Sequence, residues 1–209
     1  MKTILCYGDS LTYAMDPVTW GRYEYDDRWT SVMERQLGTG YKIIVEALSG
    51  RTSNWDLPYL PFRNGKEPLM MLLESHAPLD LVIIMLGTND LVSMLNKTAE
   101  ESAAGMMSLI RVIFQSLSGP DGRIPKVMIV CPPAISKLSD FMGLYYDKNV
   151  EESKKLPENY KKFAEQFGCS FINSNDYIKT CIPDGIHISR DSQKILGMKI
   201  AEDVVKLFN

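Results

Sequence analysis

The sequence contains little that would build a metal site or a disulfide framework. Only two histidines, His76 and His187, occur among its 209 residues, which argues against a multi-histidine metal centre. The four cysteines are scattered and lack the paired spacing of a zinc site or a redox dithiol. Three of them fall in or beside predicted strands, where a thiol acts as a small buried hydrophobe. We therefore expect free structural thiols, no metal, and a reducing, cytoplasmic compartment.

The chain also lacks long apolar runs and long runs of one charge. Its longest apolar stretch, near residues 81–86, is far shorter than the roughly 20 residues that a membrane-spanning helix needs. The net charge is −3, and no run of Lys and Arg marks a surface for nucleic acid or an anionic membrane. No signal peptide is expected, because residues with a functional pattern begin at position 8. We therefore expect a small or neutral partner, no nucleic acid and no membrane.

Five apolar segments predict buried strands, and segments with helical spacing separate them. The strands are expected over residues 3–7, 42–48, 81–86, 126–131 and 169–172. Thr98 and Glu101 form a capping box that opens one helix, and Ser189 caps the last one. Pro157 is expected to break or kink the helix over residues 151–167. Two long connections, 54–66 and 132–149, are expected to be irregular, and the apolar residues of the second suggest that it packs over something.

This alternation of strands and helices predicts one α/β domain over residues 1–209. The expected fold is a three-layer αβα sandwich with a five-stranded parallel sheet and helices on both faces. A flavodoxin-like strand order, 2-1-3-4-5, places the first three strands side by side. An apolar content of 45% is sufficient for a substantial core.

Polar residues and a glycine follow the first three strands, at the edge where ligands bind in such sheets. Ser10 follows the first strand, Gly50 the second and Asn89 the third, so one crevice can hold all three. Acyl transfer needs a nucleophile, a base, and donors directed at the oxyanion that forms. The Ser10 hydroxyl is the candidate nucleophile. The candidate donors are the backbone N–H groups of Ser10 and Gly50 and the Asn89 amide.

The base must be one of the two histidines. His187 is the stronger candidate because Asp184 precedes it by three residues, so that the carboxylate can bond the imidazole and fix its tautomer. His76 lies on the opposite edge of the predicted sheet, and we expect it to be structural or exposed. Asp9 and Asp90 are expected to be buried carboxylates that accept backbone donors and position the loops.

Four short segments resemble the four blocks of the SGNH (GDSL) hydrolase family. In chain order they are Gly8-Asp9-Ser10-Leu11, Gly50, Gly87-Thr88-Asn89-Asp90 and Asp184-Gly185-Ile186-His187. The resemblance implies an αβα fold, Ser10 as nucleophile, His187 as base and Asp184 as the carboxylate that orients it. It also implies an oxyanion hole made by Ser10, Gly50 and Asn89, and no cofactor.

Longer segments around these blocks look like the bacterial arylesterase and acyltransferase branch of that family. This similarity implies short-chain acyl esters, acyl transfer to alcohols or peroxide, and a homo-oligomer. Two features depart from the branch: the loop after Ser10 has Tyr13-Ala14-Met15 where tryptophan is more common, and Gly50 is alanine in some members. The acyl-chain and acceptor preferences are therefore open. The candidate pocket residues are Leu11, Tyr13, Arg51, Trp55 and Thr88.

The favoured hypothesis is a serine esterase for short acyl esters of small alcohols, phenols or sugars, with acyl transfer as a second reaction. One alternative is a lysophospholipase or thioesterase with the same triad, if the apolar loops over 13–25, 54–65 and 134–146 form a deep channel. Another is a non-catalytic, flavodoxin-like binding module. The absence of a glycine-rich phosphate loop argues against that module.

Overall fold

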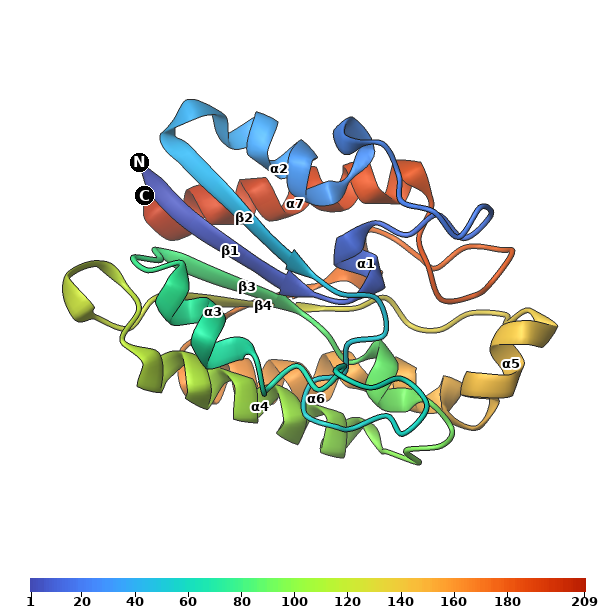
Figure 1. Ribbon diagram of the computed structural model, residues 1–209. Helices are drawn as coiled ribbons and strands as arrows, with labels where there is room; N and C mark the ends of the chain where they lie inside the picture. Colours follow the sequence, from blue (N-terminus) through green and yellow to red (C-terminus); the bar gives the residue numbers. More distant parts are fainter.

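A parallel sheet lies between two layers of helices in the computed structural model, which describes all residues 1–209 (Figure 1). Its strands are β1 (Lys2–Gly8), β2 (Tyr41–Ala47), β3 (Leu81–Met85), β4 (Lys126–Cys131) and β5 (Ser170–Asn173). They pair in the order β2-β1-β3-β4-β5, and every neighbouring pair is parallel. The predicted α/β fold and strand order are confirmed, and each strand end lies within one residue of its predicted position.

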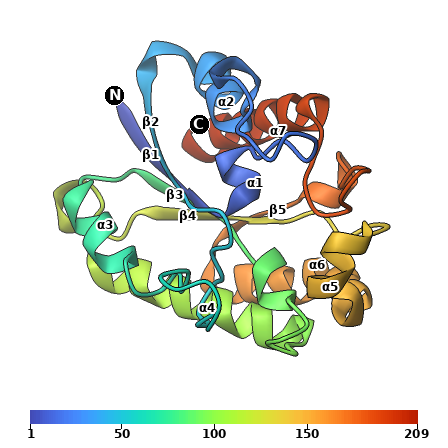
Figure 2. The same cartoon turned by 45° about the vertical axis from the view of Figure 1, so that its right-hand side comes forward.

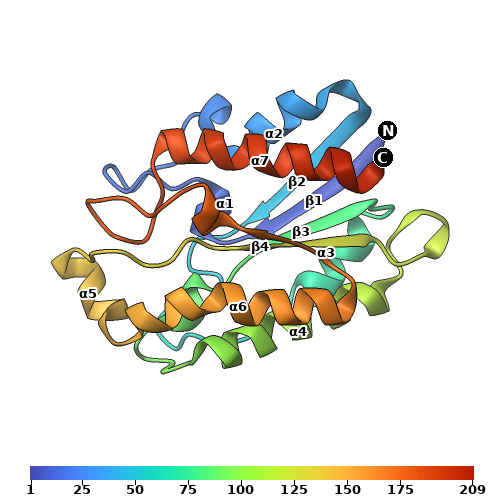
Figure 3. The ribbon, with the colours of Figure 1, turned by 180° about the vertical axis from the view of Figure 1, so that it is seen from behind.

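Helices cover both faces of the sheet. They are α1 (Ser10–Tyr13), α2 (Trp29–Leu37), α3 (Leu69–Ser75), α4 (Ala99–Ser116), α5 (Asp140–Tyr146), α6 (Val150–Phe167) and α7 (Arg190–Phe208). Short 3₁₀ turns occur at η1 (Tyr25–Asp27), η2 (Gly38–Gly40), η3 (Thr88–Leu91), η4 (Pro120–Gly122), η5 (Asp147–Asn149) and η6 (Ser174–Asp176). Figures 1 and 3 show α2 and α7 on one face, and α3, α4 and α6 on the other. None of the helices combines the length and the apolar character needed to cross a membrane.

Each face of the sheet has its own hydrophobic core. Along β1, Leu5 and Tyr7 belong to the core beneath α3, α4 and α6, whereas Ile4 and Cys6 belong to the core beneath α2 and α7. Burying one Leu or Ile side chain contributes about 1.5–3 kcal/mol, so both layers are held firmly to the sheet. This is why the central strands β1, β3 and β4 have apolar runs without alternation: both of their faces are covered.

Two local predictions were wrong: a break at Pro157, and a connection without a helix over 132–149. Helix α6 continues through Pro157. Although Pro157 cannot donate a backbone hydrogen bond, the helix buries Leu156, Tyr160 and Ala164 against the sheet, and this packing outweighs the lost bond. The connection over 132–149 contains α5, whose N-terminus is capped by the Ser139 hydroxyl, which accepts a hydrogen bond from Met142 N–H.

The sheet register brings the three predicted site segments together. Gly8, at the end of β1, pairs with Ala47 of β2 on one side and with Met85 of β3 on the other. The chain segments that follow these strands therefore begin side by side at the carboxyl edge of the sheet, next to α1 (Figure 2). They carry Ser10, Gly50 and Asn89.

Candidate active site

The turn after β1 places Ser10 at the first position of α1. A Cβ atom on Gly8 would lie 2.0 Å from the Thr12 hydroxyl oxygen, so only glycine fits where the chain turns. Asp9 caps α1 by accepting a hydrogen bond of 2.9 Å from Leu11 N–H. This turn directs the Ser10 side chain toward the space above the sheet edge.

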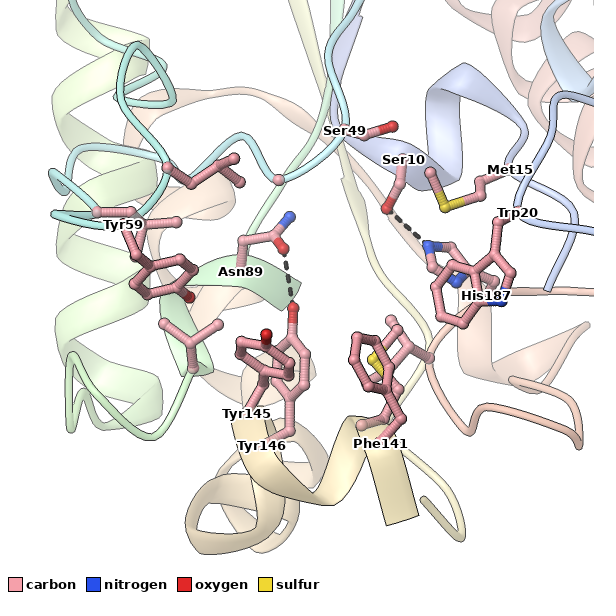
Figure 4. A pocket seen from close by; sticks show the side chains of 16 residues that line it. Ser10, Met15, Trp20, Ser49, Tyr59, Asn89, Phe141, Tyr145, Tyr146 and His187 are labelled. Atoms are coloured by element: carbon pink, nitrogen blue, oxygen red, sulfur yellow. Dashed lines mark hydrogen bonds between the residues drawn. The ribbon is translucent and has the colours of Figure 1, made fainter. Parts of the chain in front are cut away.

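A continuous hydrogen-bonded chain links Asp184, His187 and Ser10. His187 Nε2 lies 2.9 Å from Ser10 Oγ (Figure 4). On the other side of the ring, His187 Nδ1 lies 2.5 Å from Asp184 Oδ2. All three side chains are buried: Asp184 is 1% exposed, His187 is 4% exposed and Ser10 is 7% exposed. Because an ionised carboxylate can only accept, it fixes the proton on Nδ1 and leaves Nε2 to accept the Ser10 proton.

The Asp184 carboxylate is held in its charged form. Burial alone would raise its pKa, but hydrogen bonds from the His187 side chain and from the backbone outweigh burial and lower the pKa below its ordinary value. The backbone donors are Ile186 N–H at 2.8 Å and His187 N–H at 2.9 Å, both to Oδ1. The carboxylate thus orients the imidazole through both the side chain and the backbone of His187.

Gly185 fits the segment between Asp184 and His187 against a neighbouring loop. Its φ is +80°, a conformation that favours glycine. A Cβ atom there would lie 2.5 Å from the backbone oxygen of Lys137. The Gly185 carbonyl also accepts a hydrogen bond of 3.0 Å from Ser136 N–H. The position of the Asp184–His187 segment therefore depends on this close backbone contact.

Hydrogen-bond donors from two further segments face the same space as Ser10. Gly50 has a φ of +80°, and its N–H donates to no acceptor within the protein. Asn89 Nδ2 donates to Asp9 Oδ2 at 3.1 Å and to the Arg51 carbonyl at 3.0 Å. His76, by contrast, pairs with Glu46 at 2.8 Å and does not line this space, in agreement with its predicted structural role.

Two buried carboxylates tie the loops of the site together, as predicted. Asp9 accepts from Leu11 N–H and from the Asn89 amide. Asp90 accepts from Ser53 N–H at 2.7 Å, from Ser53 Oγ at 2.6 Å and from Ser102 Oγ at 2.7 Å. Burial raises the pKa of Asp9 to about 7 and that of Asp90 to about 6, since it disfavours the charged form. Hydrogen bonds oppose this effect at both carboxylates.

A cavity of about 310 Å³ opens over these groups. Ser10, Gly50, Asn89 and His187 line it, while Asp184 lies behind His187. Most of the remaining wall is apolar or aromatic. It comes from the loops after β1 and β2, from the residue that follows η3, from α5, and from the segment before α7. These residues are Met15, Trp20, Ser49, Leu57, Tyr59, Leu60, Val92, Phe141, Met142, Tyr145, Tyr146 and Ile186.

None of the five predicted pocket residues lines this cavity. Leu11 points from α1 into the core beneath α7. Tyr13, at the end of α1, is half-buried, and the Arg22 guanidinium covers its ring at 4.4 Å. Thr88 is buried in the turn of η3, away from the cavity wall. In tight turns and short helices successive side chains point in different directions, so adjacency to Ser10 or Asn89 does not place a residue in the cavity.

The other two predicted pocket residues stabilise the loop after β2. Arg51 donates to the carbonyl oxygens of Gly8 and Glu46 and stacks on the Tyr7 ring at 4.2 Å. Trp55 packs under the Lys97 ammonium group at 4.1 Å. Both side chains therefore make their contacts outside the cavity.

The sequence predictions missed the aromatic residues that do line the cavity. The Trp20 ring lies edge-on to His187, with a centroid distance of 6.2 Å, and edge-on to Phe141 at 5.7 Å. The loops over 13–25, 54–65 and 134–146 were named only as the walls of a possible deep channel. Trp20 and Tyr59 come from the first two of them, and Phe141, Tyr145 and Tyr146 come from α5, within the third. The density of aromatic residues in those loops was the available signal, although it could not show which rings turn inward.

A parallel αβα fold with a Ser–His–Asp hydrogen-bonded chain at the carboxyl edge of its sheet is the arrangement of a class of serine hydrolases. The family model described as the GDSL-like Lipase/Acylhydrolase family matches residues 6–194. The chain therefore belongs to this family of SGNH (GDSL) hydrolases, and it is an esterase or acylhydrolase. This membership sets aside the alternative of a non-catalytic binding module.

Solved structures with the same fold are similar over nearly the whole chain. Est24, a carbohydrate acetylesterase from Sinorhizobium meliloti, is 40% identical, with a TM-score of 0.95 and coverage of 99% of this chain and 100% of that one. An aryl esterase from M. smegmatis is 36% identical, with the same TM-score and the same coverages. A carbohydrate acetylesterase family member from S. meliloti is 33% identical, with a TM-score of 0.93 and coverages of 98% and 97%. No curated protein matched.

Proposed function

We propose that this protein is a serine esterase that removes short acyl groups from neutral esters through an acyl-enzyme on Ser10. The observation that carries the proposal is the Asp184–His187–Ser10 chain, which ends in a cavity also lined by Gly50 and Asn89. This arrangement supports a nucleophile, a base and oxyanion donors that act at one place, as acyl transfer requires.

The geometry supports a two-step reaction. Ser10 Oγ attacks the ester carbonyl carbon while His187 Nε2 takes the hydroxyl proton, and Asp184 stabilises the imidazolium that forms. The backbone N–H groups of Ser10 and Gly50 and Asn89 Nδ2 hold the oxyanion. The intermediate then collapses, the bond to the alcohol oxygen breaks, and His187 returns the proton to the leaving alkoxide.

The second step releases the acyl group by the same route in reverse. A water molecule attacks the acyl-serine while His187 takes its proton, and the proton then passes to Ser10 as the carboxylic acid leaves. An alcohol in place of water gives a new ester, so we propose acyl transfer as a second reaction. Incubation with an acyl ester and ethanol tests this step, because transfer produces an ethyl ester in addition to the free acid.

The cavity favours small uncharged substrates. Its wall contains no Asp, Glu, Lys or Arg, and most of its residues are apolar or aromatic. A charged acyl group would lose its hydration there without gaining a partner, whereas an acetyl or butyryl group loses little. The similar proteins named as carbohydrate acetylesterase and aryl esterase support acetyl esters of sugars or phenols as the substrates.

A series of acyl-chain lengths on one phenol tests the substrate class. The proposal predicts that kcat/KM is highest for acetyl to butyryl esters and falls for octanoyl and dodecanoyl esters. A maximum at the long chains would favour the lysophospholipase or thioesterase alternative, since the cavity would then have to extend into a channel.

The proposal also includes a homo-oligomer and a reducing, cytoplasmic compartment. Apolar side chains are exposed on the loops and the helix around the cavity, among them Phe62 at 86% and Leu144 at 77%, and neighbouring subunits would cover them. The four unpaired thiols support the reducing compartment. Light scattering tests the assembly, and a monomer at micromolar concentration would contradict it.

A further inference from the structure

The Asn89 side chain has a partner that the proposed reaction does not use. The Tyr146 hydroxyl, at the end of α5, donates a hydrogen bond of 2.9 Å to Asn89 Oδ1 (Figure 4). Both residues are 6% exposed, so water does not compete freely for this bond. Tyr146 comes from a segment 57 residues further along the chain.

We propose that Tyr146 is a positioning residue that orients and polarises the Asn89 amide for oxyanion stabilisation. The inference rests on the proposed function, because it assigns Tyr146 an effect that is exerted only through Asn89.

The contacts around Asn89 agree on one orientation of the amide. Asp9 Oδ2 and the Arg51 carbonyl accept from Nδ2, while the Tyr146 hydroxyl donates to Oδ1. A flipped amide would place its oxygen against these two acceptors and toward the reacting carbonyl, where charge repulsion opposes it. In the observed orientation the amide nitrogen faces the side of the cavity where Ser10 lies (Figure 4).

The hydrogen bond from Tyr146 also strengthens Asn89 as a donor. The two Nδ2 protons are already engaged by Asp9 Oδ2 at 3.1 Å and by the Arg51 carbonyl oxygen at 3.0 Å, which are ordinary lengths for N–H···O bonds. An oxyanion must therefore share a proton with one of these acceptors or displace it. A donor on Oδ1 draws electron density from the amide and makes its N–H groups better donors, which favours that exchange.

The surroundings keep Tyr146 in a donating role and at a fixed place. Burial and the charge of Asp9 raise the pKa of Tyr146 well above its ordinary value, so the hydroxyl keeps its proton. The segment after Asn89 is bonded to the segment around Tyr146: Ser93 N–H donates to the Tyr145 carbonyl, and Asn149 Nδ2 donates to the Leu91 carbonyl. The cavity wall formed by α5 is thereby coupled to the donor.

The first test is Tyr146→Phe, which keeps the ring and removes the donor. Since a single hydrogen bond contributes modestly, kcat for an acetyl ester should fall about 3- to 10-fold, with KM changed less than about twofold. Tyr160→Phe is the matched control. The Tyr160 hydroxyl is buried and bonded to the Leu86 carbonyl at 3.2 Å and to Ser102 at 2.9 Å, but it does not line the cavity. That variant should lose comparable stability and keep its kcat.

The decisive measurement combines Tyr146→Phe with Asn89→Ala. If Tyr146 acts through Asn89, the double variant has the same kcat as Asn89→Ala alone. Losses that multiply contradict the inference. So does a Tyr146→Phe protein that fails to fold while Tyr160→Phe folds, since the role would then be structural. An Asn89→Ala variant with normal kcat would instead remove the oxyanion assignment of the proposed function.

Discussion

Gly50 and Gly185 share a φ of +80°, and a Cβ atom added to either would lie 2.5 Å from a neighbouring atom. The neighbours differ in their freedom to move. At Gly50 the neighbour is Leu60 Cδ2, the tip of a flexible side chain, whereas at Gly185 it is the backbone oxygen of Lys137. Replacing each glycine with alanine therefore compares a soft contact with a rigid one at the same φ.

The expected losses in the free energy of unfolding follow from these contacts. Alanine at positive φ lowers it by about 1–2 kcal/mol. Gly168→Ala is the control for this backbone effect alone, because the φ of Gly168 is +64° and no atom lies within 4 Å of a Cβ added there. Gly50→Ala should cost about the same, because Leu60 can rotate away. Gly185→Ala should lower the free energy of unfolding by about 1–3 kcal/mol more than Gly168→Ala does, a loss typical of overpacking. The reason is that the backbone at Lys137 must shift to admit the new methyl group.

The activities should separate more sharply than the stabilities. A displaced Gly185 moves Asp184 and His187 relative to Ser10, and a misplacement of about 1 Å can cost about 10²-fold in rate. Gly50→Ala should keep most of kcat but change the preferred acyl size, because Leu60 lines the cavity. Urea unfolding and kcat with acetyl and butyryl esters test both effects. A Gly185→Ala protein as stable as Gly168→Ala, with full activity, would refute this reasoning.

Asp184→Asn should lower kcat steeply without unfolding the protein, because it favours the wrong imidazole tautomer, and adding it to His187→Ala should cause scarcely any further loss. His76→Ala should keep most activity, and multiplicative losses in the double variant would argue against a catalytic unit. Because burial raises the pKa values of Asp9 and Asp90 from about 3.8 to about 7 and about 6, the stability linked to these groups is full below about pH 4 and is lost as the pH rises to about 7. The urea-unfolding free energy should therefore fall from pH 5 to pH 8, and less so in Asp90→Asn; a rise over this range would contradict the assignment.

The sheet was predictable because each strand is marked by its own apolar segment and five such segments occur along the chain. The segment over 81–86 is apolar throughout, as expected of a strand that is covered on both faces. Once five such strands alternate with helices, the handedness and connection rules leave few topologies. The break expected at Pro157 was wrong for the opposite reason: a local rule was applied where the packing of Leu156 and Tyr160 against the sheet decides the outcome.

The catalytic candidates were predictable and the cavity wall was not. Ser10, Gly50 and Asn89 are placed by strand ends, which the sequence pattern locates, and the short Asp184–His187 spacing is a local constraint. Side-chain direction in irregular segments depends on distant contacts, so Arg51 and Trp55 turned away from the cavity. The bond from Tyr146 to Asn89 joins segments that no periodicity relates, and it became visible only in three dimensions.

The central claim is that Ser10 carries the acyl group. Mass spectrometry of the intact protein after brief reaction with an acetyl ester, or with a fluorophosphonate, measures this directly. The account predicts one adduct on wild-type protein, located at Ser10, and a folded Ser10→Ala variant with no adduct and with esterase activity near background. An adduct on the Ser10→Ala variant, or turnover that persists in it, would contradict the account and place the nucleophile elsewhere.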